Sequence, residues 1–447
     1  MMEKIETFAA DISSFVWGEY LLIPLLSIVG VYLTIRLHAL PWLKLSSAFR
    51  LLVRKPRDDE GEISPRHALM TAMSATIGTG NIAGVATAIY FGGPGAVFWM
   101  WLIALFGMAT KYGEAVLAIK FRQIDNLGQY VGGPMYYIKN GLGARWRWMA
   151  TAFALFGMIA AFGIGNMVQS NSVADALNST YSIDKSYTGI AMAVLVGIVI
   201  LGGIRRIAEV VSKIVPTMAF AYITCTLMIL FVYRTEIPAA FFLILKGAFS
   251  GTAAGGGFLG ASIWMAIRFG VARGIFSNES GLGSAAIAHG AAKTKEPVEQ
   301  GLVAMLGTFI DTIIICSLTA LVLIVTGAWS SGENGAAMST FAFASGLRWG
   351  GDHIVSLGLA VFAFTTIIGW SYYGERCAAF LFGVKVIQLY RIIWVAAVSS
   401  GAAIKFDLVW TLADIFNGLM ALPNLIALML LSPVIVHETR RYFSSNS

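Results

Sequence analysis

Residues 74–84 place glycines and small polar side chains in the middle of an apolar run. The letters there are Ser-Ala-Thr-Ile-Gly-Thr-Gly-Asn-Ile-Ala-Gly, inside a run from about Ala68 to Phe91 that is long enough to cross a bilayer. Glycine costs a helix interior about 1 kcal/mol relative to alanine. Unwound backbone is tolerated at membrane depth only where it lines a cavity; there, freed carbonyls bind cations and a half-helix N-terminus attracts anions. The stretch predicts either such a binding site or, from Gly80-xxx-Gly84, close helix packing.

The composition places the chain in a membrane. Of its 447 residues, 57% are hydrophobic and 12% are charged, whereas a soluble domain averages about 25% charged. The net charge of +7 comes from Lys and Arg in short loops between apolar runs, which indicates membrane topology rather than nucleic-acid binding. Three cysteines and five scattered histidines show no metal-ligand spacing. The glycines at 78 and 80 lack the spacing and the preceding strand of a dinucleotide loop.

Eleven apolar runs have the length of spanning helices. We therefore predict an all-α polytopic membrane protein with about eleven transmembrane helices. Most of the 31 Lys and Arg residues, including Arg268 and Arg273, fall in loops on the side of the C-terminus. The positive-inside rule then predicts that the N-terminus lies outside and the C-terminus in the cytoplasm. The expected location is the cell (inner) membrane. The runs lie roughly at 17–36, 67–91, 95–119, 148–176, 186–203, 209–233, 238–269, 298–328, 353–377, 385–403 and 407–433.

Ten of these helices divide into two sets of five. The first helix of one set is interrupted at Ile77–Asn81, and the first helix of the other set is interrupted at Gly251–Gly260. By the predicted topology, these two helices run in opposite directions. Interruptions at matching places in two halves are typical of inverted-repeat transporters with a site at the membrane midplane. The predicted segments are 1–66 (one helix and a cytoplasmic loop), 67–233 (first repeat), 238–433 (second repeat) and 434–447 (cytoplasmic tail).

Several motifs together resemble the alanine or glycine:cation symporter family, over nearly the whole chain. The resemblance implies sodium-coupled uptake of alanine or glycine, with sodium as the co-transported ion. It also implies a LeuT-type 5+5 inverted repeat with one extra N-terminal helix. The motifs that carry it are Thr76–Ile89, Gly92–Ala96, Phe98–Trp101, Gly107–Tyr112 and Gly270–Ala285.

The resemblance assigns roles around the first break. The N–H groups of Thr79 and Gly80 would bind the substrate carboxylate. The carbonyls of Ser74 and Ile77 would bind sodium, because hard cations prefer oxygen ligands. Two adjacent hydroxyl residues on a later helix, Thr365 and Thr366, would complete that ion site; the alternative is that they bond back to their own helix.

Other residues are expected around the substrate. Trp370 resembles a pocket wall that would restrict the substrate side chain to hydrogen or methyl, the alternative being a packing aromatic. Gln169 resembles a carboxylate contact, the alternative being an interhelical hydrogen bond. Phe162 is expected to close the pocket, and Gly255, in the second interruption, is a further substrate contact.

Charged residues inside the predicted helices are functional candidates because their burial is costly. Asp311, with Asn81, is a candidate for a second cation or coupling site; the roles of protonatable group and of partner for Arg273 stay open. Glu279 belongs either to an inner gate with Arg273 or to a helix cap. Lys111 and Glu114 are three residues apart and are expected to pair on one helix face.

The predicted function is sodium-coupled symport of alanine or glycine by alternating access. A proton-coupled carrier of another small solute is the first alternative. An ion channel fits less well, since two breaks of opposite direction in one chain suit a carrier. No enzymatic activity is expected, because no P-loop, HExxH motif or nucleophile–base pair is found. The expected partners are the amino acid substrate and the lipid bilayer, with no nucleic acid.

Overall fold

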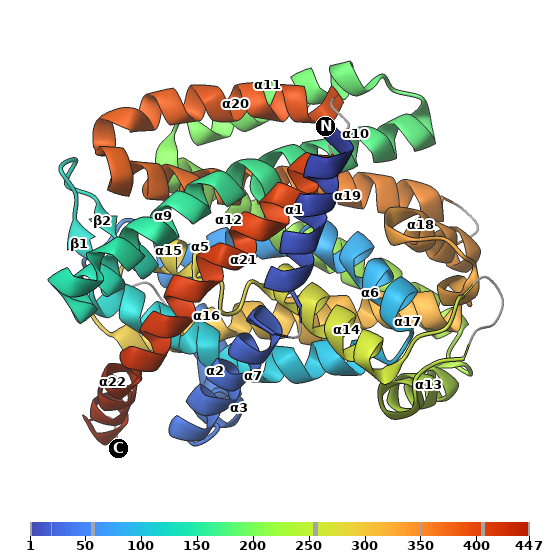
Figure 1. Cartoon of the computed structure of the whole chain (residues 1–447), viewed down its shortest axis with the longest axis horizontal. Coiled ribbons are helices and arrows are strands. Elements are labelled where there is room, and N and C mark those ends of the chain that lie inside the picture. The colour runs from blue at the N-terminus through green and yellow to red at the C-terminus, as the bar shows by residue number, and fades with distance from the viewer. Residues whose placement is uncertain are drawn as a thin grey trace.

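The chain folds almost entirely into helices that pack around one another (Figure 1). The computed structural model describes residues 2–18, 20–54, 59–253, 258–347, 350–403 and 407–445. Within that part, the only strands are β1 (Gln123–Ile124) and β2 (Tyr130–Val131), an antiparallel hairpin in which Gln123 lies opposite Val131.

In the described part, the first half of the chain contains four helices ahead of the first interrupted one. Its helices are α1 (Met2–Val16), α2 (Leu22–Arg36), α3 (Leu40–Leu43), α4 (Leu45–Val53), α5 (Pro65–Thr76), η1 (Gly80–Gly84), α6 (Val85–Gly92), α7 (Ala96–Lys120), α8 (Pro134–Tyr137), η2 (Ile138–Leu142), η3 (Ala144–Trp146), α9 (Arg147–Phe162), η4 (Gly163–Met167), α10 (Val168–Tyr181), α11 (Lys185–Ile200) and α12 (Gly203–Val232).

The second half begins with a helix that covers only the first part of the predicted run at 238–269. Its helices are α13 (Ile237–Ser250), α14 (Ile263–Asn278), α15 (Ser284–Gly290), α16 (Pro297–Thr308), η5 (Phe309–Cys316), α17 (Ser317–Val325), η6 (Ala328–Ser330), α18 (Gly335–Gly346), α19 (Gly351–Phe382), η7 (Val384–Val386), α20 (Ile387–Ala403), α21 (Asp407–Leu430) and α22 (Ser432–Ser445).

Seven helical stretches in the described part are long and apolar enough to cross a membrane. Shorter apolar helices include α2 and α11, and no piece of the two interrupted helices is longer than the 16 residues of α14. The chain is thus a multi-pass membrane protein, whereas the total of eleven spans stays a prediction. The seven stretches are Ala96–Lys120, Ala144–Tyr181, Gly203–Val232, Pro297–Val325, Gly351–Phe382, Val384–Ala403 and Thr411–Leu430.

The prediction of a single helix at 238–269 is wrong. Helix α13 ends at Gly251, whose φ of +72° stops the helix, and Thr252 then pairs with Ala261 in a short antiparallel bridge. A new helix begins where the Ser262 hydroxyl accepts a hydrogen bond from the Met265 N–H. The glycine-rich stretch therefore joins two helices instead of interrupting one. Residues 254–257, with the expected substrate contact Gly255, lie outside the described residues.

The second interruption instead separates α14 from α15. Glu279 has a left-handed φ of +55°, and Gly281 and Gly283 have φ of +91° and +82°. This correction also moves Arg268 and Arg273 out of the predicted inside loop and into α14. The interrupted helix of the second half is therefore 263–290.

The described residues form four π-helical segments, which have wider turns than an α-helix. Segment η1 lies in the first interrupted helix, η2 follows α8, η4 lies between α9 and α10, and η5 lies between α16 and α17. Segment η1 packs against η5, and η4 packs against α19. Because π-turns insert a residue into the helical period, they frequently occur at functional sites.

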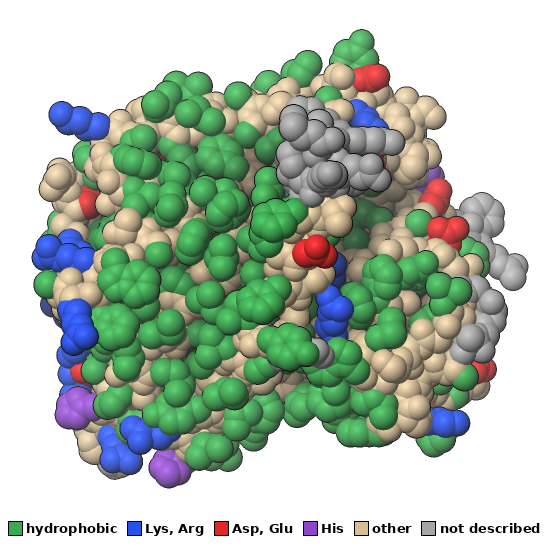
Figure 2. Space-filling view, viewed as in Figure 1, with side chains coloured by type: hydrophobic (Ala, Val, Ile, Leu, Met, Phe, Trp, Pro, Cys, Tyr) green, Lys and Arg blue, Asp and Glu red, His purple; other side chains and the backbone are tan. Residues whose placement is uncertain are grey.

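The surface supports placement in a bilayer. Figure 2 shows hydrophobic side chains spread over most of one face, while Lys and Arg gather toward its left and lower-left edge. That edge is where Figure 1 places the β1–β2 hairpin and α22. An apolar belt with basic residues at one end is typical of a membrane protein.

Candidate functional site

The first interrupted helix changes its hydrogen bonding at Gly78. In a continuous helix, the Gly78 N–H would bond to the carbonyl of Ser74, four residues earlier. It donates instead to the side-chain Oδ1 of Asn81, at 2.9 Å. The Asn81 N–H, which would bond to the carbonyl of Ile77, goes to the Gly78 carbonyl at 3.3 Å. Both usual donors to the Ser74 and Ile77 carbonyls are therefore directed elsewhere.

The break is fully enclosed by the protein. Ser74, Ile77 and Asn81 are 0% exposed, and Thr79 is 6% exposed. The N–H groups of Thr79 and Gly80 lie at the start of the new helical segment, where no preceding turn supplies carbonyl partners. The predicted interruption is thus confirmed. Backbone N–H and C=O groups that lack their usual helical partners lie together in one buried place.

The close-packing alternative applies to one of the two glycines. A Cβ added to Gly80 would lie 3.3 Å from the Cα of Ser277 in α14, so Gly80 permits a tight helix contact. A Cβ added to Gly84 would meet nothing within 4 Å. Gly84 is therefore not required for packing between the described residues.

Helix α19 packs directly against the first break. A Cβ on Gly78 would lie 2.6 Å from the hydroxyl of Thr366, and Gly369 leaves room for Ser74 in the same way. The Thr366 hydroxyl donates to the Phe362 carbonyl at 3.0 Å, which leaves its lone pairs free on the side of Gly78. The structure thus brings Thr366 to the predicted ion site.

Thr365 lies differently. Its hydroxyl also donates to the Phe362 carbonyl, at 2.9 Å, and it lies 3.6 Å from the sulfur of Met218 in α12. The bond back to its own helix, left open as an alternative, is therefore present for both threonines. Of the two hydroxyls, that of Thr366 is the one that lies next to Gly78.

The backbone of the second break is held by charged side chains of α7. The Lys111 ammonium donates to the Glu279 carbonyl at 3.1 Å. The Glu114 carboxyl accepts the N–H groups of Gly281 and Gly283 at 3.0 and 3.1 Å. Lys111 and Glu114 thus turn toward the break, and the expected pairing with each other is not among the ion pairs of the described residues. Their i,i+3 spacing places both on the face that meets α15.

Asn424 of α21 completes this support. Its amide donates to Glu114 Oε1 at 2.7 Å and to the Gly281 carbonyl at 2.9 Å, and its oxygen accepts a hydrogen bond from the Tyr137 hydroxyl. These contacts could not be predicted from the sequence, because the residues that meet are separated by more than 100 positions.

Asp311 lies where the two breaks approach each other, and it is 0% exposed. Its Oδ1 accepts the Asn81 amide at 2.7 Å, and its Oδ2 accepts the hydroxyls of Ser277 and Thr312 at 2.9 and 2.8 Å. Asn278 in turn donates to the Thr312 hydroxyl at 3.0 Å. The predicted association of Asn81 with Asp311 is therefore seen in the structure. Ser277, Asn278 and Thr312 were not predicted, although the first two directly precede the Gly281-x-Gly283 turn.

Arg273 approaches neither Asp311 nor Glu279 in any recorded contact. Its guanidinium lies 5.6 Å from the ring centroid of Phe276. Together with Asp414 and Trp17 it lines a small cavity of about 130 Å³ between α1, α14 and α21. The expected Arg273–Glu279 gate is thus not formed in this structure. Glu279 ends α14, as the cap alternative requires.

Trp370 reaches from α19 to the second break. Its indole N–H donates to Glu279 Oε1 at 2.9 Å, and only 1% of the residue is exposed. Its side chain packs on Gly165 of η4, where an added Cβ would lie 2.3 Å from the Trp370 Cβ. Trp370 therefore lies between both breaks and η4.

Gln169 and Phe162 lie on either side of η4. The Gln169 amide donates to the Ile164 carbonyl at 3.0 Å, while its oxygen is buried with no partner among the described residues. An acceptor in that state is available to a bound ammonium or hydroxyl group. The ring of Phe162 packs against Tyr390 and Trp394 of α20. Its role at the pocket stays a prediction.

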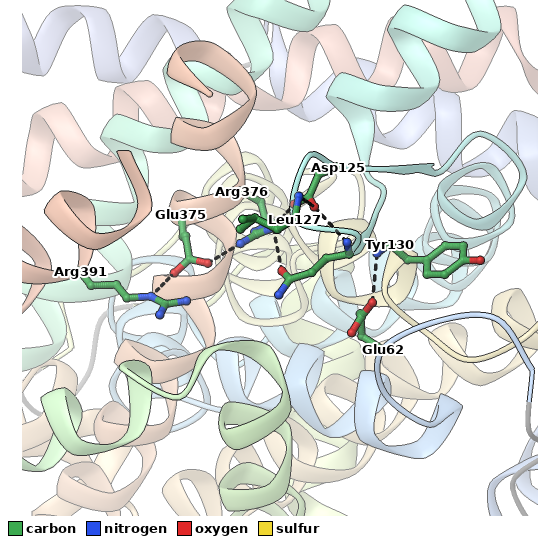
Figure 3. Close-up of polar contacts among 8 residues, drawn as sticks. Glu62, Asp125, Leu127, Tyr130, Glu375, Arg376 and Arg391 are labelled. Atoms are coloured by element: carbon green, nitrogen blue, oxygen red, sulfur yellow. Dashed lines mark hydrogen bonds and ion pairs between the residues drawn. The ribbon is translucent and has the colours of Figure 1, made fainter. Parts of the chain in front are cut away.

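The basic end of the molecule is joined by a chain of ion pairs (Figure 3). Arg376 bridges Asp125 of the hairpin, at 3.1 Å, and Glu375, at 2.6 Å; Glu375 also pairs with Arg391 of α20 at 2.6 Å. Glu62 accepts the Tyr130 N–H at 3.2 Å. These contacts connect α19 with α20 and with the hairpin, and they connect the hairpin with the segment before α5.

Comparisons with known proteins identify the family of the chain. The family model described as the sodium:alanine symporter family matches residues 2–447. An uncharacterized transporter of Haemophilus influenzae is 52% identical over 442 residues, which cover 98% of this chain and 96% of that protein. The sodium/alanine symporter AgcS of Methanococcus maripaludis is 50% identical over 439 residues, 96% of each chain. A mutant manganese transporter of Eremococcus coleocola aligns in structure with a TM-score of 0.48 at 14% identity, over 85% of this chain and 82% of that one.

Proposed function

Because this chain belongs to the sodium:alanine symporter family, we propose that it takes up alanine, and glycine as a second substrate, by sodium-coupled alternating access. The observation that carries the proposal is the redirected hydrogen bonding at Gly78 and Asn81. It leaves the carbonyls of Ser74 and Ile77 without their usual donors, beside the hydroxyl of Thr366.

We assign sodium to these three oxygens. Carbonyl and hydroxyl oxygens suit a hard cation and add no full charge of their own. Thr365 remains a proposed fourth ligand that would need to turn from Met218 toward the break. The bound charge would raise the affinity of the site for the substrate carboxylate, which we place at the N–H groups of Thr79 and Gly80.

The rest of the substrate is assigned to side chains around the break. Gln169, whose oxygen has no partner among the described residues, would accept a hydrogen bond from the ammonium group of the zwitterion, and its NH2 group, which now donates to Ile164, would contact the carboxylate. Trp370 would limit the side chain to hydrogen or methyl. Phe162 would close the pocket from α9, and Gly255 stays proposed as a contact.

A second cation is proposed at Asp311. Its carboxyl accepts hydrogen bonds from three uncharged side chains, those of Asn81, Ser277 and Thr312. Among the described residues it forms no ion pair. A buried carboxyl in this position is a cation ligand or a protonatable group. This cluster is the observation that keeps proton coupling as the second candidate.

The transport cycle would use the two halves as an inverted repeat, 67–233 and 238–433, with the N-terminus outside. Each charge that enters down the membrane potential supplies about 2.3 kcal/mol per 100 mV. Arg273, beside Asp414 in its small cavity, is proposed to gate one side, with Glu279 moving at the second break.

Uptake of labelled alanine into proteoliposomes tests the proposal. Replacing external sodium with choline should remove concentrative uptake, because the ion both completes the site and supplies the driving force. Undiminished uptake in choline would contradict sodium coupling, and uptake that follows an imposed proton gradient and is lost in Asp311→Asn would favour the second candidate. Saturable uptake with a fixed ratio of sodium to alanine would exclude a channel.

Binding to purified protein tests the residues. Thr366→Ala should weaken sodium-dependent alanine binding by roughly 10- to 150-fold, the effect of one charge-assisted contact of about 1.5–3 kcal/mol. Gln169→Ala should weaken alanine binding at saturating sodium. Thr226→Ala is the matched control, since Thr226 is equally buried and bonds back to the Tyr222 carbonyl within α12. Unchanged affinity in both site variants would remove the assignment.

A further inference from the structure

The base of the Trp370 side chain is positioned by neighbours on its own helix and on η4. Trp370 follows Gly369, which packs against Ser74 at the first break. Its Cβ and Cγ lie on the bare backbone of Gly165 in η4, where an added Cβ would be 2.3 and 2.4 Å away. Tyr373, one turn later, meets the indole edge-on with 5.5 Å between ring centroids. These contacts fix the base of the side chain, but they leave the far end of the indole to be fixed by something else.

The far end is fixed by Glu279. Oε1 of this carboxyl accepts a hydrogen bond from the indole N–H at 2.9 Å. A buried indole N–H normally needs an acceptor, so the ring position follows the position of the carboxyl. Among the described side chains at the second break, Glu279 supplies that acceptor.

In this conformation Glu279 is itself held by hydrogen bonds. Its backbone has a left-handed φ of +55°, unusual for a residue with a Cβ. Its Oε2 accepts the Ser284 hydroxyl at 2.6 Å, and its carbonyl accepts the Lys111 ammonium at 3.1 Å. The carboxyl is therefore tied at its second oxygen, and its backbone is tied to α7. Such a residue can set the orientation of a neighbour.

We propose that Glu279 determines substrate size by positioning Trp370: its carboxyl holds the indole across the space for the substrate side chain, so that hydrogen or methyl fits and larger groups do not. This rests on the proposed function, in which Trp370 is the pocket wall. Glu279 is then a positioning residue for selectivity, beyond its role as the end of α14.

The proposal separates selectivity from affinity. If Glu279 only ended a helix, its removal would weaken all substrates together. If it positions the indole, its removal lets the ring leave this orientation. The affinity for substrates with larger side chains then rises relative to the affinity for alanine. The ratio of two affinities is therefore the informative quantity.

The test is competition for sodium-dependent binding of labelled alanine to the purified full chain, with unlabelled alanine and leucine as competitors. Glu279→Ala and Trp370→Phe, which keeps an aromatic ring but lacks the N–H, should each shift the leucine-to-alanine ratio toward leucine by about tenfold or more, since pocket space for added methylenes is worth roughly 10- to 200-fold. Glu279→Gln keeps an acceptor oxygen and should return the ratio to within about threefold of wild type.

Two results would overturn the proposal. One is an equal loss of affinity for both competitors in the variants, and the other is a wild-type ratio in Trp370→Phe, which stays informative should Glu279→Ala fail to fold. The sodium concentration for half-maximal alanine binding serves as the control and should stay near that of wild type. Wild-type protein without sodium-dependent alanine binding would instead refute the proposed function, which is a distinguishable failure.

Discussion

The two breaks differ in what surrounds their backbone groups. At the first break, Asn81 draws the Gly78 N–H away from the Ser74 carbonyl, and neutral groups surround the freed oxygens. At the second break, Lys111 and Glu114 bond directly to the backbone of Glu279, Gly281 and Gly283. The first break thus has backbone groups available to a ligand, whereas those of the second are already satisfied by protein.

This difference separates binding from support. A binding site needs groups whose partners arrive with the substrate, and such groups contribute little to the stability of the protein alone. A support needs partners that are always present, and removing one leaves buried donors unsatisfied. Substitutions at the second break should therefore lower stability, and those at the first break should lower ligand affinity.

The largest expected effect is loss of stability in Glu114→Ala. The substitution leaves the N–H groups of Gly281 and Gly283 buried without an acceptor, at a cost of about 1–3 kcal/mol for each group. Thermal unfolding in detergent should show a clearly lower midpoint. Glu114→Gln retains the acceptor oxygen and should lie close to wild type; equal midpoints for Glu114→Ala and wild type would remove the distinction between the breaks.

Gly78→Ala comes next, and it should act on binding. Its Cβ would lie 2.6 Å from the Thr366 hydroxyl, inside the proposed ion site. Overpacking of this kind costs about 1–3 kcal/mol, so sodium affinity, measured by calorimetry with alanine present, should fall by roughly 10- to 100-fold. Gly84→Ala is the matched control, because it meets nothing within 4 Å. Similar losses in both variants would contradict a local effect at Thr366.

The smallest expected effect concerns the link between the breaks. Asn81 contacts Gly78 of the first break and Asp311, while Ser277 beside the second break contacts the same carboxyl. A double-mutant cycle of Asn81→Ala and Ser277→Ala, read in sodium affinity, should give a coupling of about 0.5–1 kcal/mol. Additive effects would show that the Asp311 cluster does not connect the two breaks.

The first break was predictable because all of its signals lie in one short stretch. Glycines, hydroxyls and Asn81 occur together inside a single apolar run, and the residue that replaces the helical bond, Asn81, is three positions from Gly78. The helical class and the membrane location followed from composition and from run length. Thr366 was found through the family resemblance rather than through spacing.

The second break was missed because a more glycine-rich stretch lies nearby. The stretch Gly251–Gly260 contains more glycines, but the Ser262 cap starts a new helix after it. The true break has a glutamate, Glu279, in its left-handed position, and its supports at Lys111, Glu114 and Asn424 come from distant parts of the chain. Propensity favours Gly or Asn at such a position, so only the fold reveals why Glu279 is there.

The most direct measurement is an experimental structure with thallium in place of sodium and with alanine bound, in which anomalous scattering locates the ion. The account predicts a peak that touches the carbonyls of Ser74 and Ile77 and the hydroxyl of Thr366, with the alanine carboxylate at Thr79 and Gly80. A peak away from these oxygens, or a Gly78 N–H bonded to the Ser74 carbonyl in the loaded protein, would contradict it.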